Sequence, residues 1–146
     1  MIELDTSFHY LLMASQALFQ RKVMAHLADC GLTAGQPKVL DYLGLHNGSV
    51  QKAIAAGCQI EPATLTGILN RMEEKGLIYR QMENGDRRSL HVYLTEEGKE
   101  KQKLVRETLE GLTREILSEI SSEEQQVLLE CLVKICTKMI DAEVLQ

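Results

Sequence analysis

Residues 50–76 decide the fold of this chain; they are VQKAIAAGCQIEPATLTGILNRMEEKG. A short helix is predicted over 50–56, and Gly57 is placed to end it in the left-handed conformation that glycine adopts easily. After a short turn, Pro62 suits the first position of a second helix, because that position needs no N–H donor. This second helix is predicted over 62–75. Two short helices joined by a tight turn indicate a helix-turn-helix.

A change of period follows the second helix. Residues 77–81 and 89–94 alternate in a way typical of strands, and a polar loop that contains Asn84-Gly85 separates them. A hairpin directly after a helix-turn-helix is a wing. The loop also carries Asp86, Arg87 and Arg88, and arginine on a thin hairpin suits the DNA minor groove, where negative potential is concentrated.

Helices are predicted on both sides of this segment. A first helix is expected over 6–29, and residues 33–36 (TAGQ) have the form of a capping box for the next. Beyond the hairpin, Thr95 followed by two acids begins another helix, and residues 122–125 (SEEQ) form a second capping box. Only 4% of residues are aromatic, with no Trp, which favours helices packed by aliphatic side chains. The predicted fold class is therefore mainly α with a small antiparallel β-hairpin wing.

Two longer strings resemble the MarR (multiple antibiotic resistance regulator) family. Residues 84–98 (NGDRRSLHVYLTEEG) resemble its D-x-R wing tip, the strand that follows and L-T-x-x-G. Residues 69–78 (LNRMEEKGLI) resemble the end of its recognition helix. The resemblance covers essentially the whole chain and implies one domain over 1–146, a winged helix-turn-helix flanked by N- and C-terminal dimerisation helices. The winged part is expected over 33–95 and the dimerisation helices over 1–32 and 96–146.

The face of the second helix agrees with this resemblance. Its inner stripe is apolar and consists of Leu65, Ile68, Leu69 and Met72. The opposite face is small near its start and offers hydroxyl, amide and guanidinium groups, which suits a helix in the DNA major groove. The predicted DNA contacts on this helix are Pro62, Ala63, Thr64, Thr66, Gly67, Asn70 and Arg71. The resemblance implies that Arg88 enters the minor groove, with Asp86 paired to it and fixing its direction. Arg87 is then expected to contact phosphate.

Long apolar stripes on the first and last helices predict burial against a second copy, and the resemblance implies a homodimer. Two recognition helices related by a two-fold axis imply a palindromic operator in double-stranded DNA. The net charge is −5, but residues 33–95 sum to +1 and residues 96–146 to −5. Because the acid is concentrated near the C-terminus, the overall sign does not exclude DNA.

The resemblance also implies an effector, typically a small aromatic or lipophilic anion. By topology alone, the effector pocket is expected at His9, Met13, Tyr42 and His46. A redox switch through Cys30 is the alternative, although the peroxide-sensing cysteine near the start of the family's first helix has no counterpart here. The histidines and cysteines lack metal-ligand spacing, so neither a metal nor a cofactor is expected.

Other functions find less support in the sequence. It contains no G-x-S-x-G elbow, phosphate loop or H-E-x-x-H, so an enzyme is not expected. No apolar run is long enough to span a membrane and no signal peptide is evident, so the prediction is a cytoplasmic protein with no membrane contact. A winged-helix module for protein contacts without DNA binding stays open, although Arg71, Arg87 and Arg88 favour DNA. The predicted function is a DNA-binding transcriptional regulator, with repression favoured over activation.

Overall fold

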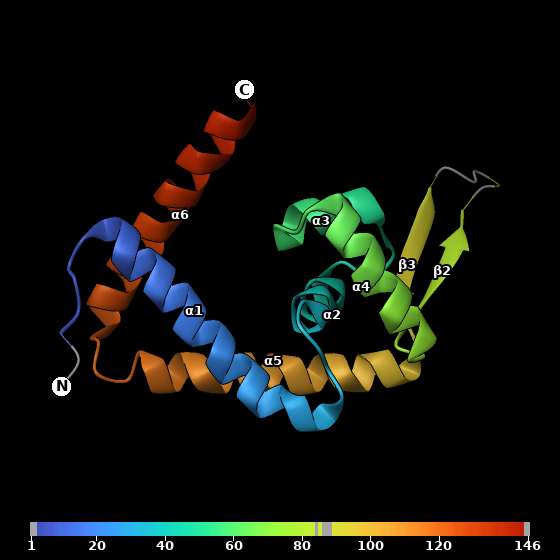
Figure 1. The fold of residues 1–146 in the computed structure, drawn as a ribbon, viewed down its shortest axis with the longest axis horizontal. Helices are drawn as coiled ribbons and strands as arrows, with labels where there is room; N and C mark the ends of the chain where they lie inside the picture. Colours follow the sequence, from blue (N-terminus) through green and yellow to red (C-terminus); the bar gives the residue numbers. More distant parts are fainter. Residues whose placement is uncertain (1–2, 84, 86–88, 145–146) are drawn as a thin grey trace. The chain divides into compact units, whose positions relative to one another are not determined.

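The computed structural model describes residues 3–83, 85 and 89–144 (Figure 1). The chain forms two compact units, residues 1–110 and 111–146, and helix α5 runs across their boundary. In chain order the elements are α1 (Phe8–Leu27), a 3-10 turn (Ala28–Cys30), α2 (Gln36–Leu45), β1 (Ser49–Val50), α3 (Gln51–Cys58), α4 (Pro62–Glu74), β2 (Ile78–Met82), β3 (Leu90–Leu94), α5 (Glu96–Ile116) and α6 (Ser122–Val144).

The predicted fold class is confirmed. Helices α3 and α4 form the helix-turn-helix, and β2 and β3 form the antiparallel hairpin that follows it. The predicted start of α4 at Pro62 is correct, and the helix ends one residue earlier than expected. The prediction of a single domain over 1–146 is not tested by the fold and stays a prediction.

The sheet has one strand more than the sequence indicated. Its order is β1-β3-β2, and β1 pairs antiparallel with β3 through Ser49 and Val50. The preceding Gly48 donates its N–H to Val92 O at 2.9 Å, and Asn47 Oδ1 accepts the N–H of Leu94 at 2.9 Å. A strand of two residues is too short to show alternation, so periodicity could not reveal it.

The predicted role of Gly57 as a C-cap is wrong. Helix α3 continues through Gly57 to Cys58, and Gln59 adopts the left-handed conformation at φ 54°. A Cβ at Gly57 would lie 2.2 Å from Cε2 of Tyr42. Glycine is therefore required here because the Tyr42 ring packs against the backbone of α3, and the turn is made by Gln59.

Of the two predicted capping boxes, the one at α2 is half formed and the one at α6 is displaced by one residue. The residue that precedes α2 is Gly35, at φ 86°, while Thr33 contributes only its N–H, which Gln36 Oε1 accepts at 3.0 Å. At α6 the box begins one residue earlier than predicted. Ser121 Oγ accepts the N–H of Glu124 at 3.2 Å, and Glu124 Oε1 accepts the N–H of Ser121 at 3.3 Å.

The core of the first unit lies between the helix-turn-helix and the helices beside it. All four predicted inner residues of α4 are buried. Their buried neighbours come from α1, α2, α3, the sheet and the first part of α5, and include Leu27, Leu40, Leu43, Ile54, Ile78, Val92 and Val105. Burial of this aliphatic surface, at roughly 25 cal/mol per Å², is the main term that holds α4 in place.

Polar links also attach α4 and α5 to the rest of this unit. At the end of α4, Lys75 Nζ donates to Gly31 O at 2.7 Å and to Oε1 of the fully buried Gln36 at 3.2 Å. Arg106 of α5 lies 3.1 Å from Asp41 of α2. These links hold the end of α4 against Gly31 and the start of α2, and they hold α5 against α2.

In the second unit, α6 is joined to the end of α5 by a short turn. The side-chain amide of Gln125 closes this turn by donating to Leu117 O at 3.1 Å and Ile120 O at 2.9 Å.

Candidate nucleic-acid interface

The outer face of α4 is open to solvent, as the periodicity predicted. Pro62, Ala63, Thr64, Thr66, Asn70 and Arg71 are exposed, and Gly67 is half-buried. The apolar stripe on the opposite side of α4 is buried, so one face of the helix packs in the core and the other is open to solvent. The structure thus brings all seven predicted α4 contacts onto one accessible surface.

Thr66 is held by two hydrogen bonds. Its hydroxyl donates to Pro62 O at 3.1 Å and accepts from Gln51 Nε2 at 2.6 Å. Because Gln51 is the first residue of α3, this contact joins the two helices of the helix-turn-helix near the start of α4. The sequence analysis did not identify Gln51.

Arg80 of β2 joins the wing to α4. Its Nη2 donates to Asn70 Oδ1 at 2.8 Å, and its Nε lies 3.1 Å from Glu73 Oε2. Arg80 was not among the residues predicted from the sequence, although strand alternation places it on the same sheet face as the buried Ile78. That alternation was the signal that could have shown Arg80 facing the helix.

Arg71 lies close to Gly67 on the outer face. A Cβ at Gly67 would be 3.4 Å from Nη1 of Arg71. The guanidinium therefore lies beside Gly67 on the outer face of α4, close to any ligand that approaches this face.

The base of the wing is stiffened by aromatic and polar contacts. The rings of Tyr79 and Tyr93 stack at 5.4 Å, and Tyr93 donates its hydroxyl to Glu83. That hydrogen bond raises the pKa of Tyr93 above its ordinary value. His91 Nδ1 lies 2.6 Å from Gly48 O, which ties β3 to the turn before β1. The predicted contacts Asp86, Arg87 and Arg88 lie outside the described residues.

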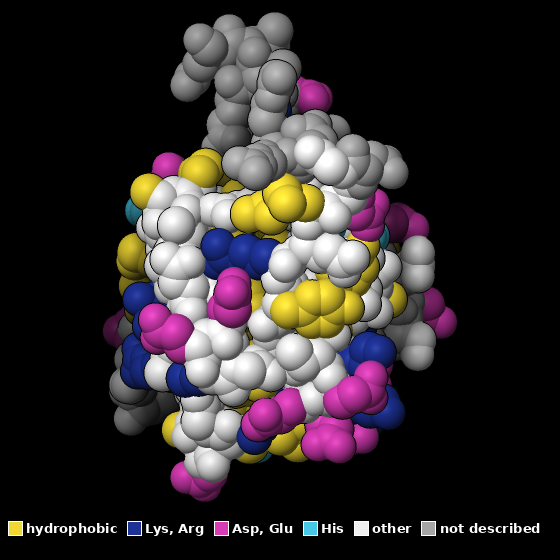
Figure 2. Space-filling view, turned by 90° about the vertical axis from the view of Figure 1, so that its right-hand side faces the viewer, with side chains coloured by type: hydrophobic (Ala, Val, Ile, Leu, Met, Phe, Trp, Pro, Cys, Tyr) yellow, Lys and Arg dark blue, Asp and Glu magenta, His cyan; other side chains and the backbone are white. Residues whose placement is uncertain are grey.

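Charge on this side of the molecule is mixed. Figure 2 shows the side that carries the wing and the end of α4; there Lys and Arg side chains are scattered among acidic and apolar ones. Among the described residues, the cations of this part, such as Arg71 and Arg80, are separate and form no continuous basic patch. A phosphate backbone that approached the described part of this face would meet separate cations and not a continuous basic patch.

The predicted effector residues fall into two groups. Tyr42 and His46 come together on α2, with ring centroids 4.5 Å apart. His9 and Met13 are exposed on the first turns of α1, which Figure 1 shows apart from α2. Within one chain the four do not form a single site, so this pocket stays a prediction.

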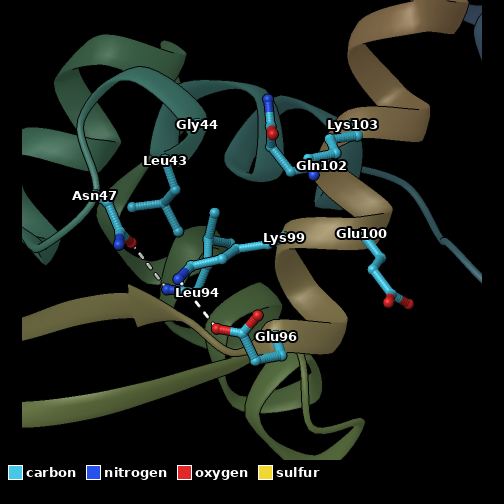
Figure 3. A pocket seen from close by; sticks show the side chains of 9 residues that line it. All are labelled: Leu43, Gly44, Asn47, Leu94, Glu96, Lys99, Glu100, Gln102 and Lys103. Carbon is cyan, nitrogen blue, oxygen red and sulfur yellow. Dashed lines mark hydrogen bonds and ion pairs between the residues drawn. The ribbon is translucent and has the colours of Figure 1, made fainter.

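A cavity of about 380 Å³ lies elsewhere, between α2, the end of β3 and the start of α5. Figure 3 shows Leu43 and Leu94 inside it, Lys99 paired with Glu96 at 3.2 Å, and Glu100 pointing away. None of the predicted effector residues lines it.

The thiol of Cys58 has little access to solvent. It lies at the end of α3, and its Sγ is 3.6 Å from Lys38 O. Burial raises the pKa of this thiol to about 11, although the positive charge of Lys38 acts to lower it. Cys30 is half-buried and also a free thiol. Its backbone carbonyl accepts from Lys101 Nζ at 3.0 Å. A redox role for Cys30 stays a prediction.

We expect Cys58 to be alkylated much more slowly in the folded protein than in the same protein unfolded in urea. At pH 8 a thiol with a pKa of about 11 is roughly one part in a thousand thiolate, whereas an ordinary thiol is about a quarter thiolate. Peptide mass spectrometry after timed iodoacetamide treatment measures both rates. Equal rates at Cys58 in the two states would contradict this assignment.

Two kinds of feature are absent from the part of the chain that the structure describes. No group of three or more His, Cys, Asp or Glu side chains there is placed to hold a metal ion. In the same residues, no helix is long and apolar enough to cross a membrane.

The exposed face of α4 beside a hairpin defines a winged helix-turn-helix protein. The model of the MarR family matches residues 32–90. The organic hydroperoxide resistance transcriptional regulator of Bacillus subtilis is 31% identical over 117 residues, 78% of this chain and 80% of that protein. The transcriptional repressor MdtR of the same organism is 31% identical over 112 residues, 75% of this chain and 72% of that protein. The chain belongs to the MarR family of transcriptional regulators.

Solved structures agree on the fold. The S. aureus MepR–DNA complex superimposes with a TM-score of 0.84 at 24% sequence identity, over 92% of this chain and 99% of that one.

Proposed function

We propose that this protein is a sequence-specific DNA-binding repressor of transcription that acts as a homodimer on a palindromic operator. The observation that carries the proposal is the outer face of α4, which is exposed while its polar side chains are held by Gln51 and Arg80. Side chains held in one orientation on an accessible helix suit contacts with bases and phosphates in a major groove. A repressor among the relatives and a DNA complex among the similar structures support the same function.

Exposed apolar side chains support the homodimer. On α1 they include Phe8 and Met13, 60% and 63% exposed, and on α6 Val133, 65% exposed. Large apolar side chains repeated along a helix face are costly in water and mark an interaction surface. A second copy of the chain would cover both helices and place two α4 helices about one turn of DNA apart.

Effector control would act through the same helices. The dimer would have conformations that differ in the distance between its two α4 helices. A small aromatic or lipophilic anion that binds one conformation better would shift the dimer between DNA-binding and non-binding states. The site of this effector stays a prediction, because the four residues expected to line it come from two separate places in one chain.

Replacing the wing arginine is expected to weaken operator binding. Arg88→Ala should reduce the binding free energy by about 1–3 kcal/mol at fixed salt, because an arginine contact in the groove is lost. Arg21→Ala is a matched control, since Arg21 is an exposed arginine of α1 outside the winged part. Titration of both variants against the same operator gives the comparison, and unchanged affinity in Arg88→Ala would refute the wing assignment.

A further inference from the structure

The amide of Asn70 is oriented by the wing. Its Oδ1 faces β2 and accepts a hydrogen bond from Arg80 Nη2 at 2.8 Å. Arg80 cannot move away easily, because its Nε lies 3.1 Å from Glu73 Oε2 and its side chain is only 20% exposed. Asn70 and Glu73 lie one turn apart on α4, so the guanidinium bridges two side chains of the same helix face.

This contact determines which half of the amide is offered to a ligand. Rotating the amide by half a turn would set its NH₂ against the N–H groups of Arg80, two donors facing each other. The described part of the chain gives Asn70 Nδ2 no partner, and the residue is exposed. Asn70 therefore presents a donor to the outside and keeps its acceptor on Arg80.

Thr66 is fixed in a complementary way. Its hydroxyl proton is used on Pro62 O at 3.1 Å, and Gln51 donates to the same oxygen at 2.6 Å. The hydroxyl thus has no proton left for a ligand, and the exposed side chain also carries a methyl group. A methyl group suits apolar contact with the C5-methyl of thymine.

Arg71 completes the set. Its guanidinium can only donate, and among the described residues it has no acceptor partner. Asn70 and Arg71 are neighbours on α4, so the polar part of this face consists of adjacent donors. In the major groove, guanine offers two acceptors and thymine one; adenine offers the N7 acceptor beside its amino donor, and cytosine offers only an amino donor.

We propose that α4 favours guanine or thymine at the position that Asn70 contacts, and that Arg80 is the positioning residue that disfavours adenine there, because it denies Asn70 the two-bond contact with that base. Recognition of adenine by asparagine needs Oδ1 to accept from the adenine amino group while Nδ2 donates to N7. Arg80 holds Oδ1 away from that arrangement. This inference rests on the proposed function, because it assumes that α4 enters the major groove of an operator.

The experiment is selection of binding sites from randomised duplexes with the full-length chain and its variants, followed by sequencing. The wild type should enrich guanine or thymine at one position in each half-site. Arg80→Met, which removes the donor but keeps an unbranched apolar stem, should raise adenine at that position about tenfold. Arg80→Lys keeps a donor within reach of Oδ1 and should restore the wild-type preference.

Two controls separate orientation from general loss of charge. Glu73→Gln keeps a side-chain acceptor for Arg80 Nε and leaves the Arg80–Asn70 hydrogen bond in place, so its base preference should match the wild type. In an Asn70→Ala background, Arg80→Met should no longer change the preference. An Arg80→Met protein that loses affinity equally for all sequences, or keeps the wild-type preference, would overturn the inference. A wild type that enriches no sequence would instead overturn the proposed function on which the inference rests.

Discussion

Gly98→Ala is expected to lower the free energy of unfolding by about 3 kcal/mol, because the site has no room for a methyl group. A Cβ there would lie 2.0 Å from Leu77 O and 3.0 Å from the carbonyl carbon of Leu77. The obstacle is backbone, which cannot rotate aside as a side-chain end can. The same carbonyl accepts the N–H of Thr95 at 3.0 Å, so moving it would break the junction between the wing and α5.

The control for this prediction lies in the same helix. Gly111 is in α5, and the nearest atom to a Cβ there is Arg114 Nη2 at 4.0 Å. Gly111→Ala should therefore raise the free energy of unfolding by about 0.5–1 kcal/mol through helix propensity. Urea unfolding at one fixed protein concentration measures both variants. If Gly98→Ala were as stable as Gly111→Ala, the close approach to Leu77 would be wrong.

Leu65→Ala should lower the free energy of unfolding by about 2–5 kcal/mol, since it removes a large side chain from a packed core. Leu65 is 0% exposed on the inner face of α4. The cavity would form beneath the recognition helix, so operator affinity should fall as well, through loss of the folded helix rather than of a DNA contact.

Thr64 is the matched comparison, because it precedes Leu65 and is exposed. Thr64→Ala should change the free energy of unfolding by less than about 0.5 kcal/mol. Urea unfolding and operator titration on the two variants separate the faces of α4. A Leu65→Ala protein with wild-type stability would show that this face is not in the core.

The sequence was most informative where a period repeats over several turns. The buried stripe of α4 and its exposed face follow from the 3.6-residue repeat, and Pro62 marks the start of the helix. The strand pair was predicted for the same reason, from alternation over five or more residues. Within the L-T-x-x-G string, the capping role of Thr95 was predicted from the residues, whereas the glycine was recognised by resemblance alone. In the structure its Thr95 Oγ1 accepts the N–H of Gly98 at 3.0 Å, and Gly98 allows the approach to Leu77.

Other features depend on contacts between distant residues, which one sequence does not show. Gly57 was interpreted through local turn preference, whereas the Tyr42 ring is what requires it. The strand β1 exists because β3 pairs with it, and the capping serine of α6 is one of two adjacent serines with equal local merit. Arg80 was visible as a strand residue, but its hydrogen bond to Asn70 depends on how the wing packs against α4.

The central claim is that α4 and the wing bind a specific operator, and fluorescence anisotropy across a salt series tests it most directly. The purified protein would be titrated into labelled intergenic DNA from beside its own gene. The account predicts nanomolar, sequence-dependent binding that weakens with salt, at one dimer per palindrome. Weak binding, or equal binding to any DNA, would contradict it and favour a winged-helix module that contacts another protein.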